Sequence, residues 1–103
     1  MRVLAIDPGY DRLGIAVLEK QNGQEIALFS ACAITDKKQT HGERLATIGG
    51  AVQDAIRKWK PNALAIETLF LFSNQKTAMK VAEARGVVLY EAARAGLKIF
   101  EYT

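Results

Sequence analysis

Two short apolar runs, each followed at once by an acidic residue, constrain the fold of this chain more than any other feature. The first covers residues 3–6 and precedes Asp7, and the second covers residues 63–66 and precedes Glu67. Continuous apolar runs of this length are typical of central strands in a parallel sheet, covered on both faces. The carboxyl ends of such strands meet at one edge, where ligands bind. The pattern therefore predicts an α/β sheet with Asp7 and Glu67 close together at that edge.

The rest of the hydrophobic pattern predicts the other elements and their order. Further strands are expected at residues 13–18, 25–34 and 97–102, and helices from Thr40 to Lys60 and from about Gln75 to Ala95. The turn at residues 21–24 has the composition of a hairpin turn. The order βββαβαβ contains two helical crossovers, so we expect the first, fourth and fifth strands to be parallel, with two antiparallel strands on the other edge.

Both expected helices are amphipathic. The first follows a capping box formed by Thr40 and Glu43. Its inward face is expected to consist of apolar residues spaced by three and four, namely Leu45, Ile48, Val52, Ile56 and Trp59. In the second helix we expect Asn74 to cap the start and Gly96 to follow the end. Its expected inward residues are Ala78, Val81, Ala82, Leu89 and Ala92.

The composition fits one globular domain spanning residues 1–103. The chain is 50% hydrophobic and 24% charged, with a net charge of +3, which excludes a disordered chain and does not by itself indicate a nucleic-acid partner. No apolar run approaches the roughly 18–20 residues of a membrane span, so we expect a cytoplasmic protein with no membrane partner. The single cysteine, Cys32, lies among apolar residues and is expected to be a buried thiol in a reducing compartment.

Asp7 and Glu67 are candidate metal ligands. If their strands are neighbours about 4.8 Å apart, the two carboxylates converge and repel each other unless a cation lies between them. Mg²⁺ prefers such oxygen ligands and completes its coordination with water and phosphate oxygens, which favours hydrolysis of a phosphate ester. The structural alternatives are a turn opened by Asp7 before Pro8-Gly9, and a helix cap or an ion pair at Glu67.

Three motifs give the chain a resemblance to a known family. They are Ile6-Asp7-Pro8-Gly9 with Gly14 downstream, Ile66-Glu67 followed by Phe70 and Asn74, and the block AMKVAEARGV at residues 78–87. Together they resemble the RuvC family of Holliday-junction resolvases, most specifically from Glu67 to Gly86. The resemblance implies a ribonuclease H-like fold, which is an α/β fold with a five-stranded mixed sheet and flanking helices.

The resemblance also implies an activity and partners. RuvC proteins are homodimers that nick four-way DNA junctions in recombination and repair, with Mg²⁺, or Mn²⁺ in its place, held by four acidic residues. A junction-migrating helicase complex is their implied partner. Asp7 and Glu67 match the first two acids, and the other two belong to a helix after the fifth strand, beyond Thr103. We therefore expect this chain alone to bind Mg²⁺ weakly and to cleave poorly or not at all, with Glu101 not replacing a missing acid.

The same resemblance selects candidate DNA-binding residues. Phe70 matches an aromatic residue that stacks on an unpaired base near the junction centre, although residues 69–72 could instead close the end of the core. Lys76 and Lys80 share one helix face and could contact phosphates or form an ordinary solvated stripe. Arg85 lies near the apolar face, so a phosphate contact and a buried or interface ion pair are both open.

Two further expectations concern the helices. In RuvC the second helix contributes to the dimer, and Gly86 would let a partner helix approach closely. His41, the only histidine, lies within the capping box. The sequence indicates no partner for it, so we assign it no catalytic role.

Three alternatives to a junction nuclease remain open. Residues 12–16, RLGIA, resemble the YqgF family, which would imply an RNase for ribosomal RNA processing. Asp7-Pro8-Gly9 also fits the Asp-x-Gly phosphate-binding turn of sugar-kinase and actin-like ATPases, although the chain is short for their two-domain cleft. The third alternative is a catalytically silent module for DNA binding or dimerisation.

Overall fold

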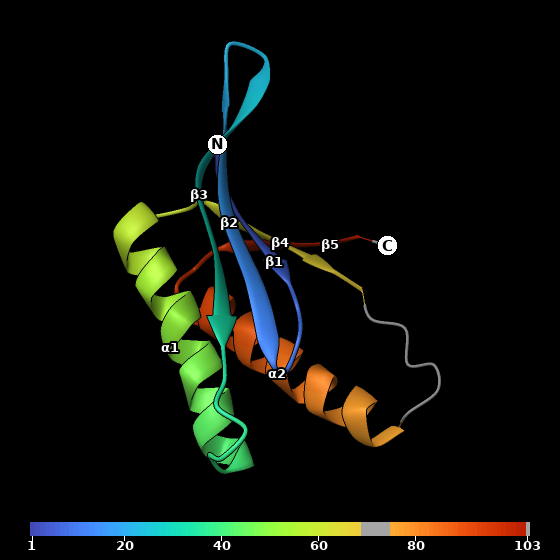
Figure 1. The fold of residues 1–103 in the computed structure, drawn as a ribbon. Helices are drawn as coiled ribbons and strands as arrows, with labels where there is room; N and C mark the ends of the chain where they lie inside the picture. The colour runs from blue at the N-terminus through green and yellow to red at the C-terminus, as the bar shows by residue number, and fades with distance from the viewer. Residues whose placement is uncertain (69–74, 103) are drawn as a thin grey trace.

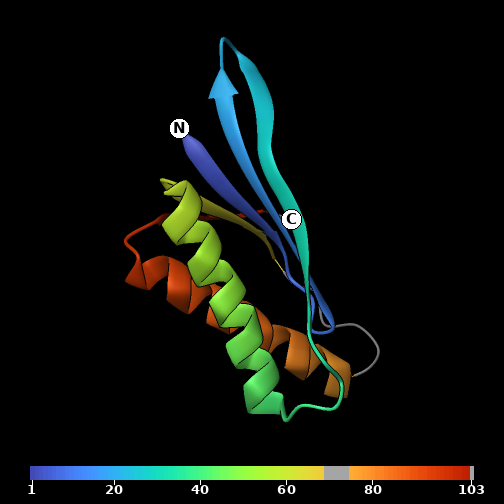
Figure 2. The same ribbon diagram turned by 60° about the vertical axis from the view of Figure 1, so that its left-hand side comes forward.

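The computed structural model describes residues 1–68 and 75–102, which form one sheet with both helices on the same face (Figures 1 and 2). The strands are β1 (Arg2–Asp7), β2 (Arg12–Gln21), β3 (Gln24–Ile34), β4 (Ala63–Glu67) and β5 (Lys98–Tyr102). The helices are α1 (His41–Trp59) and α2 (Gln75–Arg94), which pack against each other. The predicted elements and the predicted five-stranded mixed sheet with two helices are confirmed.

The strand order β3-β2-β1-β4-β5 matches the predicted topology. β1 pairs in parallel with β4 and β4 with β5, while β2 and β3 continue the sheet antiparallel on the other side of β1. The register sets Ile6 opposite Ile66. Because the next residue in each strand is an acid, the sheet brings Asp7 and Glu67 to adjacent positions, on backbones about 4.8 Å apart.

The core lies between the sheet and the two helices. Leu4 and Ile6 of β1 and Leu64 and Ile66 of β4 are at most 1% exposed. They form one cluster with buried residues of both helices, namely Ile48 and Val52 of α1 and Ala84 and Val88 of α2. Burial of each larger side chain contributes about 1.5–3 kcal/mol. Because successive side chains of a strand point to opposite faces, the acids that follow Ile6 and Ile66 lie on the face away from the helices.

α1 begins and ends where the sequence predicts. The Thr40 hydroxyl accepts the N–H of Glu43 at 3.1 Å, and the Glu43 carboxylate accepts the N–H of Thr40 at 2.8 Å. The hydrogen bond from the Thr40 backbone is the main reason that the pKa of Glu43 is lowered. At the other end, Lys60 is left-handed with φ 49° and precedes Pro61, which cannot continue the helix.

The inward face of α2 differs from the predicted one. Its buried residues are Ala84, Val88, Glu91 and Ala92. Of the predicted set only Ala92 is among them; Ala78, Val81 and Leu89 are half-buried and Ala82 is exposed. The prediction was wrong at Ala82 because alanines occur on several sides of this helix, so their spacing does not single out one face. Packing against α1 and the sheet selects it instead.

The end of α2 follows the prediction. Gly96 lies just beyond the helix with φ 79°. The N–H of Gly96 donates to the carbonyl of Ala93, and that of Leu97 to the carbonyl of Ala92, both at 3.0 Å. This pair of bonds is the Schellman arrangement that commonly ends helices. The predicted N-cap, Asn74, lies outside the described residues.

Cys32 is exposed, which corrects the predicted buried thiol. It lies on the edge strand β3, in register with Gly14 of β2, which is in register with Asp7. These three positions therefore share the face of the sheet that α1 and α2 leave uncovered. Apolar neighbours along the strand predicted burial, but the tertiary arrangement puts the helices on the other face.

A helix that crosses a membrane must be both long and apolar. Neither α1 nor the described length of α2 is both long enough and apolar enough to cross a membrane.

Candidate metal centre

Asp7 and Glu67 end β1 and β4 side by side on the sheet face away from the helices. Both residues are exposed. Within residues 1–68 and 75–102, neither carboxylate takes part in a hydrogen bond or an ion pair. The predicted adjacency of these two positions at one edge is thus present in the fold, and no described side chain hydrogen-bonds to their carboxylates.

A shallow hollow of about 280 Å³ lies beside Asp7 on the same face. Gly14 of β2 stands opposite Asp7, and a Cβ atom at Gly14 would lie 3.1 Å from the Cβ of Asp7. Any side chain there would fill the space next to the carboxylate. The absence of a side chain at Gly14 therefore keeps the space beside Asp7 open.

Tyr102 lines the same hollow from β5. It is in register with Glu67, and its carbonyl accepts the N–H of Thr68 at 2.6 Å. Tyr102 is not among the residues predicted from the sequence. Alternating side chains in the last strand put every second residue on the same sheet face as Glu67. Which of them lies opposite Glu67 depends on the register of β4 and β5, which only the structure supplies.

Arg85 reaches from α2 to the ends of β4 and β5. Its Nε donates to the carbonyl of Glu67 at 3.2 Å, and its Nη2 lies 2.9 Å from Oε1 of Glu101. The Arg85 side chain is only 16% exposed. Glu101 is in register with Ile66, on the helix side of the sheet, so it does not share a face with Asp7 and Glu67. This agrees with the expectation that Glu101 does not replace a missing acid.

Two further predicted DNA-binding residues, Lys76 and Lys80, lie on α2. Lys76 is exposed, and Lys80 is half-buried with its Nζ 5.5 Å from the centre of the Tyr10 ring. Lys80 therefore belongs in part to a contact within the protein. Phe70 lies outside the described residues.

His41 has two side-chain partners, which corrects the expectation that it has none. Its Nδ1 is 2.6 Å from the Tyr10 hydroxyl, and its Nε2 is 3.1 Å from Oε1 of Glu83. Glu83 is 42 positions away in the sequence. No local pattern could have revealed this contact, because it depends on how α1 and α2 pack.

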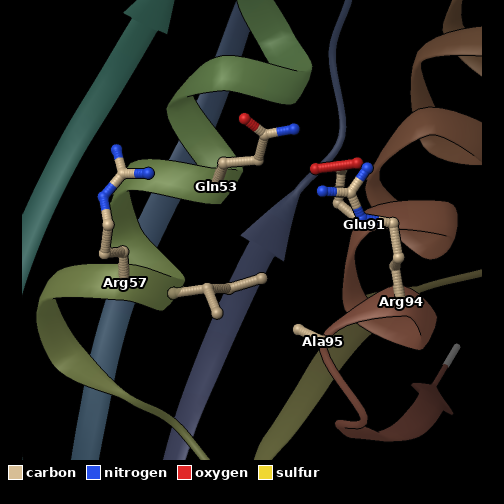
Figure 3. Close-up of a pocket in the computed structure, with 6 residues that line it drawn as sticks. Gln53, Arg57, Glu91, Arg94 and Ala95 are labelled. Atoms are coloured by element: carbon tan, nitrogen blue, oxygen red, sulfur yellow. The ribbon is translucent and has the colours of Figure 1, made fainter.

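A second hollow, of about 270 Å³, lies between the C-terminal parts of α1 and α2 (Figure 3). α1 supplies Gln53 and Arg57, and α2 supplies Glu91 and Arg94. A hydrogen bond with Tyr90, and then the charge of Glu91, raises the pKa of Arg94. None of the predicted site residues lines this hollow.

The residues present suit a hard divalent cation. Two adjacent carboxylates offer oxygen ligands, which Mg²⁺ prefers, together with open positions for water or phosphate. No cluster of three or more histidine, cysteine or acidic side chains able to hold a metal occurs in the described ranges. The donor set on these strands is therefore a pair of carboxylates.

Comparisons with known proteins agree with this fold. A family profile described as crossover junction endodeoxyribonuclease RuvC matches residues 3–103. A RuvC from Moorella thermoacetica is 41% identical over 103 residues, which are all of this chain and 62% of that protein. The structure of Thermus thermophilus RuvC in complex with a Holliday junction substrate matches with a TM-score of 0.90 and 29% identity, over 99% of this chain and 64% of that one.

A more distant protein shares the fold alone. The yeast mitochondrial Holliday junction resolvase matches with a TM-score of 0.73 at 10% identity, over 97% of this chain and 51% of that one. The chain spans between 53% and 66% of the length of the curated relatives that it matches. The profile match decides between the two families that the sequence resembles. The chain belongs to the RuvC family of crossover junction endodeoxyribonucleases.

Proposed function

We propose that this chain is the part of a junction-resolving endonuclease that carries its first two metal ligands, Asp7 and Glu67. The whole enzyme would cleave four-way DNA junctions in recombination and repair. The β1–β4 register supports this proposal most, because it puts two exposed carboxylates on one face in a fold shared with a junction-bound RuvC. Mg²⁺ is the proposed ion, with Mn²⁺ as a substitute, because both ligands are carboxylates.

In this proposal the residues of the uncovered sheet face have separate roles in binding the metal ion and the DNA phosphate. Asp7 and Glu67 bind the ion, and the space beside Gly14 receives the scissile phosphate. Tyr102 bounds that space on the β5 side. When bound, a divalent ion supplies a nucleophilic water at neutral pH and stabilises the leaving oxygen of a phosphodiester.

α2 and the segment before it would supply the DNA contacts. Lys76 and Lys80 are the proposed phosphate contacts, since both lie in the first two turns of α2. Phe70, three residues after Glu67, is proposed to stack on an unpaired base, an interaction of about 1–3 kcal/mol. Arg85 already uses Nε and Nη2 within the protein, so a DNA contact by Arg85 would use its other donors.

A homodimer is the proposed assembly, with a junction-migrating helicase complex as a further partner and the cytoplasm as the site of action. One stripe of α2 supports the dimer because its residues are exposed and apolar or small: Met79, Ala82, Gly86, Tyr90 and Ala93. A Cβ atom at Gly86 would meet nothing within 4 Å. A second helix could therefore pack closely there.

The chain by itself is proposed to bind the ion weakly and to cleave poorly. Two carboxylates leave a pair of metal ions short of ligands, and the described residues hold no larger cluster. The same observation favours a second candidate, a module that binds junctions without cleaving them.

The test measures metal and DNA binding by the 103-residue chain. Mn²⁺ binding, followed by electron paramagnetic resonance, should be weak in the wild type and at least about tenfold weaker in Asp7→Asn and in Glu67→Gln, because each loses a charged ligand. Asp54→Asn, which changes an exposed acid paired with Arg57 on α1, is the matched control and should bind as the wild type does. A labelled four-way junction should be bound in preference to duplex DNA of the same sequence.

Three outcomes would contradict the proposal. If Asp7→Asn and Glu67→Gln left Mn²⁺ binding unchanged, these residues would not be the metal ligands. Equal affinity for duplex and four-way DNA would contradict the proposal that the substrate is a four-way junction. Efficient paired nicking by this chain would show that two carboxylates suffice and would overturn the proposed weak activity.

A further inference from the structure

The connection between β1 and β2, residues 8–11, leaves the sheet directly after Asp7. Tyr10 lies at its centre and is only 8% exposed. Tyr10, its neighbour Asp11 and four polar residues from other parts of the fold form a connected group, here called the Tyr10 cluster: Tyr10, Asp11, Thr35, His41, Arg44 and Glu83. The group joins the segment after the first metal ligand to both helices.

One half of the Tyr10 cluster holds the backbone of the connection. Thr35, 4% exposed, donates its hydroxyl to the carbonyl of Tyr10 at 2.9 Å and its N–H to the carbonyl of Asp11 at 3.0 Å. Arg44 of α1, 7% exposed, donates to the Thr35 hydroxyl at 3.0 and 3.1 Å and pairs with the Asp11 carboxylate. Buried charge-assisted bonds of this kind are strong and geometrically specific.

The other half of the Tyr10 cluster runs through the Tyr10 side chain to α2. The Arg44 guanidinium lies 4.1 Å from the centre of the Tyr10 ring, within the range of a cation–π contact. The Tyr10 hydroxyl contacts His41 at 2.6 Å, and His41 contacts Glu83 of α2 at 3.1 Å. With the proton of His41 on Nε2, Nδ1 accepts a hydrogen bond from the Tyr10 hydroxyl and Nε2 donates to Glu83, which satisfies every group. This is the route from residues 8–11 to α2.

We propose that Tyr10 is a positioning residue for the metal ligand Asp7. Asp7 is the last residue of β1, so the direction of its side chain depends on the path that residues 8–11 take. Tyr10 fixes that path against α1 and, through His41 and Glu83, against the helix that carries Lys76 and Lys80. The inference rests on the proposed function, since it takes Asp7 as a metal ligand.

The experiment measures the Mn²⁺ affinity of the 103-residue chain and of five variants, Asp7→Asn among them, at a temperature where circular dichroism shows all of them folded. Tyr10→Phe keeps the ring over Arg44 and loses only the hydroxyl contact, and Glu83→Ala removes the partner at the far end. Each should weaken Mn²⁺ binding by about two- to tenfold, as the loss of one hydrogen bond implies. The double variant should be no weaker than the stronger single variant, because both changes break one chain of contacts.

Asp54→Ala is the matched control for Glu83→Ala, because it removes an exposed carboxylate from an ion pair with Arg57 on α1, outside the Tyr10 cluster. It should leave Mn²⁺ affinity unchanged. Wild-type affinity in Tyr10→Phe, while Asp7→Asn abolishes binding, would overturn this inference and leave the proposed function standing. Fully additive effects of Tyr10→Phe and Glu83→Ala would overturn the route through His41. Absence of Mn²⁺ binding by the wild type would overturn both proposals together.

Discussion

Arg85 has one hydrogen-bond partner on each of two strands, which indicates a structural role for this side chain. Its guanidinium joins the carbonyl of Glu67 to the carboxylate of Glu101, so it holds the ends of β4 and β5 together beneath the uncovered face. The planar fork of an arginine suits two acceptors at once, and here Nε and Nη2 are both engaged within the protein. At the scale of residues, a basic side chain near the proposed metal site can thus stabilise the fold by linking two strands.

We expect Arg85 and Glu101 to be energetically coupled. In a double-mutant cycle of Arg85→Gln and Glu101→Gln, urea unfolding should give a coupling energy of about 1 kcal/mol, because the Arg85 side chain is largely shielded from solvent. The matched control is the Arg57–Asp54 pair, whose side chains are 73% and 71% exposed, and whose coupling should be about 0–0.5 kcal/mol. Equal coupling in the two pairs would contradict a structural role for Arg85.

The ends of the helices were predicted correctly from the sequence, but the inward face of α2 was not. The start of α1 at the Thr40 capping box and the end of α2 at Gly96 depend on a few adjacent residues, and both are confirmed. The inward face of α2 depends on which side meets the sheet and α1, and there the prediction failed at Ala82. At the scale of elements, adjacent residues decide where a helix begins and ends, whereas packing decides which face of the helix turns toward the core.

The capping box of α1 should make a measurable contribution to stability. Thr40→Ala removes the side-chain acceptor for the N–H of Glu43 and should lower the free energy of unfolding by about 1 kcal/mol near neutral pH. Thr47→Ala is the control, because that exposed hydroxyl bonds only the carbonyl of Glu43 within the helix, and it should change stability by less than about 0.5 kcal/mol. Urea unfolding of both variants measures the difference.

The contribution of Glu43 to this box should also depend on pH. Its pKa is lowered in the folded chain from 4.5, so its stabilising contribution is fully present above that value. The contribution is lost as the pH falls through the lower folded pKa. The stability difference between wild type and Glu43→Gln should therefore shrink on acidification, and a difference that grew would contradict the assigned direction.

The exposed stripe of α2 gives a test at the scale of the whole molecule. Gly86→Glu puts a charge where a Cβ meets nothing within the chain, so the monomer should stay folded and gain up to about 1 kcal/mol in helix stability. Sedimentation should show a dimer for the wild type and a monomer for Gly86→Glu. Thr47→Glu, on an exposed position of α1, should leave the dimer intact. A wild type that sediments as a monomer would contradict the homodimer.

The sequence by itself determined the elements, their order, the parallel pairing of β1 with β4 and hence the meeting of Asp7 and Glu67. The elements follow from local hydrophobic periodicity, and the parallel pairing follows from the handedness of helical crossovers. Both could be predicted without knowledge of any side-chain contact. The tertiary structure decided the partners of Arg85 and His41, the exposure of Cys32 and the place of Tyr102 beside Glu67. Those features depend on side chains that are 16 to 42 positions apart, or on which face the helices cover, and such contacts form only when the layers pack.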